Sequence, residues 1–205
     1  MPDMWPTIGV KMSQLRCFCD IETTGLDPKV HEIISIAVLV TVDDRELTRW
    51  ELKIKPKNIE NASPEALCIN GYNETDWKDA VNLDVALLPI ADLFSKKILF
   101  IGYNPGFDLS FIRTALEAHG HHLRRLRMID VMTLVHEHLY TGGWGKMTRL
   151  NLDSVREYLG MDSDNAHQAL QDVLDTKYVY DRLTRSNIFT RLWWRVKFKL
   201  RQIKN

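Results

Sequence analysis

Long apolar runs and a secretory leader are both missing from this sequence. The longest nearly uninterrupted apolar stretch covers the eight residues Ile33–Val40 and still includes Ser35, whereas a membrane-spanning helix needs about 20 apolar residues. The N-terminus carries Pro2, Asp3 and Pro6 in place of the basic and apolar segments that mark a secretory signal. We therefore expect a chain that neither crosses a bilayer nor follows the secretory route.

Cysteine is scarce, and the thiols do not form a recognisable pattern. Cys17, Cys19 and Cys68 are an odd number, and no two of them have the partners of a zinc site. Such a set of thiols suggests a reducing compartment. We expect reduced thiols and a cytoplasmic location.

A net charge is also missing, although charge is unevenly distributed. The 205 residues include 27 basic and 27 acidic ones. Residues 182–205 hold eight of the basic residues and no acid, so residues 1–181 carry 19 basic against 27 acidic residues. With 45% hydrophobic and 26% charged residues, the composition is that of a folded domain, which excludes disordered and fibrous classes. The sequence predicts an acidic body with a basic tail.

Strand and helix patterns follow one another in an order that predicts an α/β fold. Three consecutive strands are expected at Leu15–Glu22, His31–Val42 and Leu47–Ile54, because these segments are rich in β-branched residues and are separated by turn residues. The later elements alternate between strand and helix, at Val85–Phe94 (helix), Lys97–Tyr103 (strand), Phe107–Ala118 (helix), Leu126–Ile129 (strand), from Asp130 (helix), and at Asn151–Leu159 and Ala166–Leu183 (helices). This order predicts a mixed sheet, an antiparallel meander plus parallel strands, flanked by helices.

Two carboxylates stand at the end of the first predicted strand. Asp20 and Glu22 are two residues apart, so in a strand they point to the same face with their α-carbons roughly 6.6 Å apart. Such a pair either binds a metal ion or is a solvated, mutually repulsive edge. Taken alone, the pair favours the solvated edge.

A third acid follows the predicted strand Lys97–Tyr103. Asp108 lies where the chain turns into the next helix, a position at which a carboxylate can simply cap the helix. Ligands of open α/β sheets, however, gather at the carboxyl ends of the strands. If this strand lies parallel to the first, Asp108 joins Asp20 and Glu22 at one edge.

His167 and Asp172 open the last long helix of the predicted domain. Five residues correspond to about 140° around a helix axis, so the two side chains are unsuited to ligate one metal ion but can flank a common substrate. The alternative is a polar residue near a helix start and a surface acid next to Asp175.

Three segments together resemble the motifs of the DEDDh family of 3′-to-5′ exonucleases, which have a ribonuclease H-like fold. They are Asp20-Ile21-Glu22-Thr23-Thr24-Gly25-Leu26, Asn104 through Asp108, and His167 through Asp172. The intervening segments 63–71 and 150–155 are also similar to the proofreading epsilon subunit of bacterial DNA polymerase III. The resemblance spans residues 15–183, which leaves residues 1–14 as an N-terminal extension and residues 184–205 as a tail.

The resemblance implies hydrolysis by two metal ions. Four carboxylates would hold Mg²⁺, with Mn²⁺ as a substitute, and these are Asp20, Glu22, Asp108 and Asp172. His167 would be the general base that takes a proton from the attacking water. The residues that would bind the 3′-terminal nucleotide are Thr23, Thr24, Leu26, Ile69, Asn70, Asn104 and Phe107.

The function that follows is a metal-dependent 3′-to-5′ exonuclease that removes nucleoside monophosphates from single-stranded or frayed DNA ends, in proofreading or end trimming. A 3′-to-5′ exoribonuclease of the same family is the alternative within the enzyme class. A scaffold that recruits a polymerase through its tail is the alternative outside it. The gathering of so many carboxylates argues against the scaffold, because their mutual repulsion makes sense only with metal.

The tail has the pattern of an amphipathic basic helix. Its apolar residues recur at intervals of three and four, at Ile188, Leu192, Val196, Leu200 and Ile203. The possible contacts are a polymerase or other protein partner, nucleic acid, an anionic membrane surface, and the core of this protein itself. The aromatic residues beside its cations favour a protein or nucleic-acid contact over a membrane.

A group of histidines follows the helix predicted to end near Gly120. His119, His121 and His122 stand next to Arg124 and Arg125, with no acid or cysteine nearby. A metal site is one interpretation, but basic groups at a helix C-terminus, where they complement the helix dipole, are the favoured one.

Overall fold

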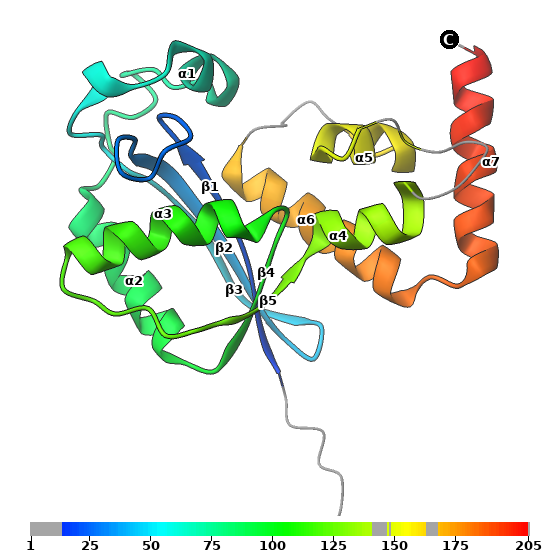
Figure 1. The fold of residues 1–205 in the computed structure, drawn as a ribbon, viewed down its shortest axis with the longest axis horizontal. Coiled ribbons are helices and arrows are strands. Elements are labelled where there is room, and N and C mark those ends of the chain that lie inside the picture. Colours follow the sequence, from blue (N-terminus) through cyan, green and yellow to red (C-terminus); the bar gives the residue numbers. More distant parts are fainter. Residues whose placement is uncertain (1–13, 141–146, 148, 163–167, 205) are drawn as a thin grey trace, which may run out of the picture.

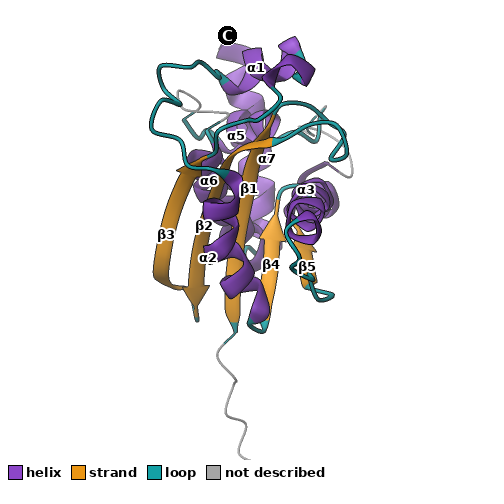
Figure 2. Ribbon diagram, turned by 90° about the vertical axis from the view of Figure 1, so that its left-hand side faces the viewer, coloured by secondary structure: helices purple, strands orange, loops and turns teal. Residues whose placement is uncertain are grey.

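A five-stranded mixed sheet forms the centre of the protein. The computed structural model describes residues 14–140, 147, 149–162 and 168–204. The strands lie in the order β3-β2-β1-β4-β5, as Figure 2 shows from left to right. β1 is antiparallel to β2 and parallel to β4, while β2–β3 is antiparallel and β4–β5 is parallel. The predicted meander and the mixed sheet are therefore confirmed.

The strand bounds agree with the sequence pattern to within two residues at most ends. The strands are β1 (Leu15–Thr23), β2 (Ile33–Val42), β3 (Arg45–Lys53), β4 (Ile98–Gly102) and β5 (Arg127–Asp130). β3 begins two residues earlier than predicted because Asp43 and Asp44 alone make the turn. Both have positive φ, 46° and 70°, which is the backbone of the two-residue hairpin turns that match the strand twist.

Helices cover both faces of the sheet. They are α1 (Pro64–Asn70), α2 (Leu83–Ser95), α3 (Pro105–Ala118), α4 (Val131–Val135), α5 (Leu152–Leu159), α6 (Ala169–Arg185) and α7 (Ile188–Lys204), with a 3₁₀ turn η1 (Ile59–Asn61) and a π-helical turn η2 (His136–Tyr140). In Figure 1, α2 and α3 lie on one side of the sheet and α4, α5 and α6 on the other, with α7 as the outermost helix. Among the described residues, no helix is both long and apolar enough to cross a membrane.

The two faces of the sheet have separate cores. One core joins the odd-numbered side chains Cys17, Cys19 and Ile21 of β1 to α2 and α3. The other joins Phe18 and the facing residues of β2 to α4, α5 and α6. Because consecutive strand residues point to opposite faces, β1 is buried on both sides. This central strand therefore has a fixed position from which to present its last residues.

Helix α1 is an element that the sequence pattern did not predict. Ser63 caps it by accepting a hydrogen bond from the amide of Ala66, Pro64 occupies its first turn, and Gly71 ends it with φ of 65°. These residues are typical helix start and stop signals. The helix buries no residue completely, so it has no apolar periodicity to detect. α1 lies at the carboxyl end of β1, seen at the top of Figure 2.

Candidate active site

An acidic cluster forms where β1 ends and α6 begins. Asp20 and Glu22 point from β1 toward Asp172 in the first turn of α6, and each of the three offers a carboxylate oxygen within 4.8 Å of the others. In Figure 1 the first turn of α6 lies next to the tip of β1. Burial of Ala169 and Val173 against the sheet fixes this first turn. Carboxylates from two distant segments thus converge on a small volume.

Asp108 reaches the same cluster from α3. This residue is buried, and its Oδ1 accepts a hydrogen bond of 3.1 Å from the amide of Ile21, between the two carboxylates of β1. α3 starts at Pro105 because the preceding residue, Asn104, turns the chain with φ of 63°. The amide of Asn104 donates a hydrogen bond to Asp130. Asp108 is therefore more than a helix cap, and it belongs to the carboxyl edge predicted from the parallel strands.

The electrostatics of the cluster fit a cation. Burial, and then the charges of Asp172 and Asp108, raise the pKa of Glu22 from 4.5 to about 8. Burial likewise raises the pKa of Asp108 from 3.8 to about 7, against its backbone hydrogen bonds. The pKa of Asp20 is raised by burial and then by Asp108, Asp172 and Glu22. Oxygen ligands that repel one another without a counterion suit a hard divalent cation.

Arg156 of α5 makes an ion-pair network behind Asp172. Its guanidinium donates 2.5 Å, 2.7 Å and 2.8 Å hydrogen bonds to Asp172, Asp175 and Asp153. The side chain is 1% exposed. Its burial works against the charge, but the bonds to Asp175 and Asp172 raise the pKa of Arg156. Gln171 donates a further bond to Asp175.

The sequence pattern did not predict this network, and Asp175 was considered only as the neighbour of Asp172. Asp172 and Asp175 are three residues apart and so share a helix face, which was the available signal for a common partner. Nothing in the sequence identified that partner as Arg156, because α5 and α6 meet only in the fold. The network holds the Asp172 side chain in one orientation.

The turn after β1 contains three of the predicted substrate contacts. Thr23 and Thr24 are buried, and their hydroxyls bond the turn itself, Thr23 to the carbonyl of Gly25 and Thr24 to the amide of Glu32. Their backbones therefore hold a fixed position beside the carboxylates. Leu26 is 82% exposed at the tip of the turn, so its side chain is free to contact a ligand.

Gly25 leaves room for a ring in this turn. A Cβ at this position would lie 2.2 Å from the His31 ring, and the ring in turn accepts a hydrogen bond from the amide of Asp27. A glycine is required here by close approach.

Helix α1 carries two more predicted contacts to the same place. Asn70 donates a hydrogen bond of 3.0 Å to the carbonyl of Thr23, and Ser63 donates its amide to the carbonyl of Thr24. Ile69 of α1 is 60% exposed. α1 is thus fastened to the turn after β1 and places an exposed apolar side chain on the same end of the molecule.

The remaining predicted positions are less uniform. Phe107 is half-buried on α3 and packs against the ring of Phe111 at 5.0 Å. Asn104 is exposed at the start of α3. His167, the predicted general base, lies outside the described residues, one position before Gln168, whose carbonyl accepts the amide of Asp172.

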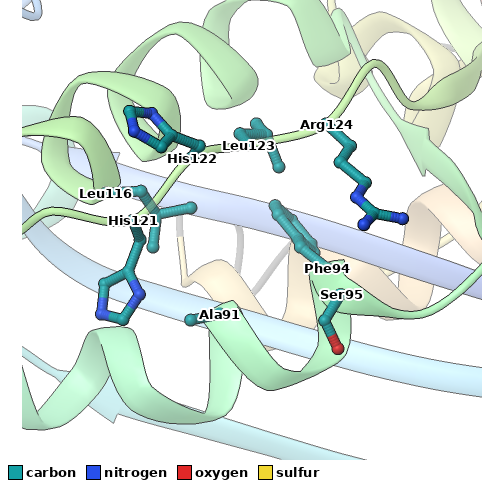
Figure 3. Close-up of a pocket in the computed structure, with 8 residues that line it drawn as sticks. All are labelled: Ala91, Phe94, Ser95, Leu116, His121, His122, Leu123 and Arg124. Carbon is teal, nitrogen blue, oxygen red and sulfur yellow. The ribbon is translucent and has the colours of Figure 1, made fainter.

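The histidine group after α3 does not form a metal site. His121 and His122 point to opposite sides of their segment in Figure 3, and the one metal-ligating group within the described residues is the cluster of Asp20, Glu22 and Asp172. The cavity of about 220 Å³ beside these histidines is lined by Ala91, Phe94, Ser95, Leu116, His121, His122, Leu123 and Arg124. None of these side chains is a carboxylate. The cavity is separate from the acidic cluster.

Comparisons with known proteins agree with this geometry. The family model described as Exonuclease (RNase_T) matches residues 17–180. DNA polymerase III PolC-type of Thermotoga petrophila is 32% identical over 165 residues, which are 80% of this chain and 11% of that protein. The corresponding protein of Thermotoga maritima is 30% identical over the same shares. E. coli Exonuclease I in complex with a dT13 oligonucleotide has a TM-score of 0.73 at 19% identity, over 88% of this chain and 42% of that chain.

These relatives are much longer than this chain, which spans about a tenth of the PolC-type polymerases and less than half of Exonuclease I. The family match nevertheless covers β1 through most of α6, and therefore all four carboxylates of the cluster. The structural likeness shows the fold, which is the ribonuclease H-like fold predicted from the motifs. The chain belongs to the exonuclease family.

Proposed function

We propose that this protein removes nucleoside monophosphates from the 3′ ends of single-stranded or frayed DNA, in proofreading or end trimming. The observation that carries the proposal is the convergence of Asp20 and Glu22 from β1, Asp108 from α3 and Asp172 from α6. The relatives named DNA polymerase III and the Exonuclease I complex with an oligonucleotide support DNA as the polymer.

The four carboxylates would hold two divalent cations, Mg²⁺ with Mn²⁺ as a substitute. Such ions supply Lewis acidity to the reacting phosphate and lower the pKa of a bound water. Asp172 is the ligand with a fixed orientation, because Arg156 and its partners hold the carboxylate from behind. His167 is the proposed general base that accepts the proton of the attacking water, a step suited to an imidazole that titrates near neutrality.

Around the cluster, the turn after β1 and helix α1 receive the terminal nucleotide in this proposal. The exposed side chains of Leu26 and Ile69 offer apolar contact to a base. Backbone groups of Thr23 and Thr24 bind the sugar-phosphate, with Asn70, Asn104 and Phe107 around them. The side-chain amide of Asn70 donates a hydrogen bond to the carbonyl of Thr23. Asn70 is therefore a positioning residue for the turn.

A cytoplasmic location is part of the proposal. Cys17 and Cys19 are buried and unpaired on β1, and burial raises the pKa of Cys17 to about 12. Such thiols are inert core side chains with no need of an oxidising compartment.

The test compares the degradation of 5′-labelled single-stranded DNA and RNA of the same sequence in Mg²⁺, Mn²⁺ and EDTA. We expect a ladder that shortens from the 3′ end on DNA, is absent in EDTA, and is absent for Asp20→Ala. Asp79→Ala, which removes an exposed acid outside the cluster, is the matched control and should leave the rate unchanged. Faster degradation of RNA would assign the exoribonuclease alternative, and full activity of Asp20→Ala would overturn the mechanism.

Duplexes test the proofreading part of the proposal. A duplex with a mismatched 3′-terminal pair should be shortened faster than a fully matched one, because a frayed end supplies the single strand that the site receives. Equal rates on the two duplexes would limit the role to single-stranded ends.

A further inference from the structure

Helix α7 packs on the body with its arginine side. Arg191 donates hydrogen bonds to the carbonyls of Leu183 and Ser186 at the end of α6 and contacts His138 at 2.9 Å, and Arg201 donates to the carbonyl of Glu157 near the end of α5. Carbonyls at helix C-termini lack partners within their helix and attract cations. The arginines of α7 therefore cap two other helices.

Two aromatic residues complete this inner side. Trp194 is 4% exposed, and the ring of Phe198 lies 4.7 Å from the ring of Tyr158. Trp194, Phe198, Arg191 and Arg201 recur at intervals of three and four, so they occupy one side of the helix. That side is the one that contacts α5 and α6.

The opposite side of α7 is apolar and faces solvent. We call it the outer face, and its residues, each between 43% and 77% exposed, are Ile188, Phe189, Leu192, Trp193, Val196 and Leu200. At 100° per residue these positions span an arc of about 140°. The stripe that a sequence would assign to the core is on the outside. A contiguous exposed patch of this kind marks an interaction surface.

The charged residues of α7 are all basic. At 100° per residue, Lys197 lies about 40° beyond Trp193 at one border of the arc, and Lys199 lies within the arc, about 20° from Ile188. The Nζ of Lys197 lies 3.9 Å from the centroid of the Trp193 ring. Residues 182–205 hold eight basic residues and no acid. The occupant of the outer face must therefore be apolar where it meets the helix and carry anionic groups close to that contact.

This requirement distinguishes among the occupants. A second copy would bring two basic helices together, and their like charges repel. Nucleic acid would meet apolar side chains first, since Arg191 and Arg201 are turned to the body. A bilayer with anionic lipids offers acyl chains to the apolar arc and phosphate groups to these lysines, as for interfacial helices with tryptophan and basic flanks.

We infer that the outer face of α7 binds the surface of an anionic lipid membrane. The apolar side chains enter the headgroup region with the helix axis in the membrane plane, and Lys197 and Lys199 reach the lipid phosphates. The sequence pattern favoured a protein or nucleic-acid contact. The orientation of α7 reverses that preference, because it hides arginines and exposes apolar residues. This binding is independent of the nuclease site.

The experiment measures binding of the full chain to lipid vesicles by co-sedimentation, without nucleic acid. Vesicles contain either phosphatidylcholine alone or phosphatidylcholine with 40% phosphatidylglycerol. We expect at least tenfold stronger partitioning to the anionic vesicles, reduced by raising NaCl, because surface charges are screened. The double variant Leu192→Glu/Val196→Glu should partition to the anionic vesicles at least tenfold more weakly. The reason is that burial of each apolar side chain contributes roughly a tenfold factor in affinity.

A matched variant separates the position of the change from its charge. Val85 and Leu88 of α2 are 48% and 62% exposed, so Val85→Glu/Leu88→Glu makes the same substitutions elsewhere. We expect it to bind vesicles within about threefold of the wild type. Both double variants should degrade a short oligonucleotide at the wild-type rate, which keeps this result separate from the nuclease proposal.

Three results would overturn the inference. Absence of binding by the wild type to anionic vesicles would assign the outer face to a protein partner. Dissociation of a wild-type dimer by Leu192→Glu/Val196→Glu, seen by analytical ultracentrifugation, would assign it to a second copy. A loss of affinity for single-stranded DNA in that variant alone would assign it to nucleic acid.

Discussion

Helices α6 and α7 have the same length and follow one another in the chain, yet they use their two sides in opposite ways. Each has 17 residues and an amphipathic pattern. α6 buries Val173, Val179 and Leu183 in the core and presents Asp172 to the acidic cluster. α7 presents its apolar side to solvent and turns Arg191 and Arg201 to the body, where they donate hydrogen bonds.

The comparison teaches that an amphipathic pattern predicts two different sides but not their partners. Apolar burial fixes α6, because the sheet offers it an apolar face. Hydrogen bonds to carbonyls at the ends of α5 and α6 fix α7, together with the burial of Trp194 and the packing of Phe198 on Tyr158. The four predictions below test this contrast, beginning with the largest effect.

The functional end of α6 should give the largest effect. Asp172→Ala removes a proposed metal ligand, and we expect the exonuclease rate to fall by about 10³-fold or more, since several kcal/mol of transition-state stabilisation would be lost. Asp181→Ala on the same helix, which removes only the pairs with Lys177 and Arg185, should stay within about threefold. Single-turnover rates of the two variants are compared, with thermal melts to show that the variants are equally stable. A rate for Asp172→Ala within tenfold of the wild type would break the assignment of α6 as the catalytic helix.

The ion pairs behind α6 come next. Arg156→Met leaves the buried Asp172 and Asp175 without their cation, and we expect about 3 to 5 kcal/mol of lost unfolding free energy. Arg156→Lys should recover only part of this, because an ammonium cannot reproduce the guanidinium geometry. Arg149→Met, at an exposed position, is the control and should change the free energy by less than about 0.5 kcal/mol. Urea denaturation gives the values, and equal losses for Arg156→Met and Arg149→Met would contradict the network.

A pair of leucines compares the two helices directly. Leu183 of α6 is fully buried, whereas Leu192 of α7 is 47% exposed. We expect Leu183→Ala to cost about 2 to 5 kcal/mol of unfolding free energy and Leu192→Ala to cost less than about 0.5 kcal/mol. The same denaturation experiment measures both. Similar losses would mean that the outer face of α7 is covered within this protein.

The acidic cluster at the start of α6 should also make stability depend on pH in the metal-free protein, through Glu22 of β1 and Asp108 of α3. The folded-state pKa values of Glu22 (about 8) and Asp108 (about 7) lie above their ordinary values of 4.5 and 3.8. The folded protein therefore holds protons that the unfolded chain has released, and its stability falls as pH rises from about 5 to 8. For each of the two groups, the unfolding free energy falls by at most about 1.4 kcal/mol per pH unit.

Thermal melts in EDTA between pH 5 and 9 measure this effect, and Mg²⁺ should raise the melting temperature more at pH 8 than at pH 6. Glu22→Gln should flatten the pH dependence. A melting temperature that rises with pH in EDTA would show that folding does not raise the pKa values of these carboxylates.

Much of the fold and of the acidic cluster was predictable from the sequence. The alternation of Asp20 and Glu22 and the parallel placement of the strand before Asp108 follow from strand geometry, and the structure places these side chains together. The helix predicted to start from Asp130 also forms, and the Oδ1 of Asp130 caps it by accepting the amide of Met132. These predictions depend on local geometry, namely the alternation of side chains along a strand and the residues that start a helix.

The remainder depended on contacts between distant segments. Helix α1 has capping residues but no buried face, so periodicity could not reveal it. Arg156 lies next to Asp172 only because α5 packs across α6. The orientation of α7 is decided by carbonyl acceptors at the ends of other helices, which no local pattern contains.

The place of β1 in the sheet affects when the active site forms during synthesis. β1 is made early, but its parallel partner is β4, and the Ile21–Asp108 hydrogen bond joins residues 87 positions apart. Closing so long a loop costs chain entropy before the contacts repay it. A growing chain that has only β1, β2 and β3 carries Asp20 and Glu22 without Asp108 or Asp172. The four carboxylates therefore come together only once α3 and α6 have docked on the sheet, so a partly synthesised chain holds no complete acidic cluster.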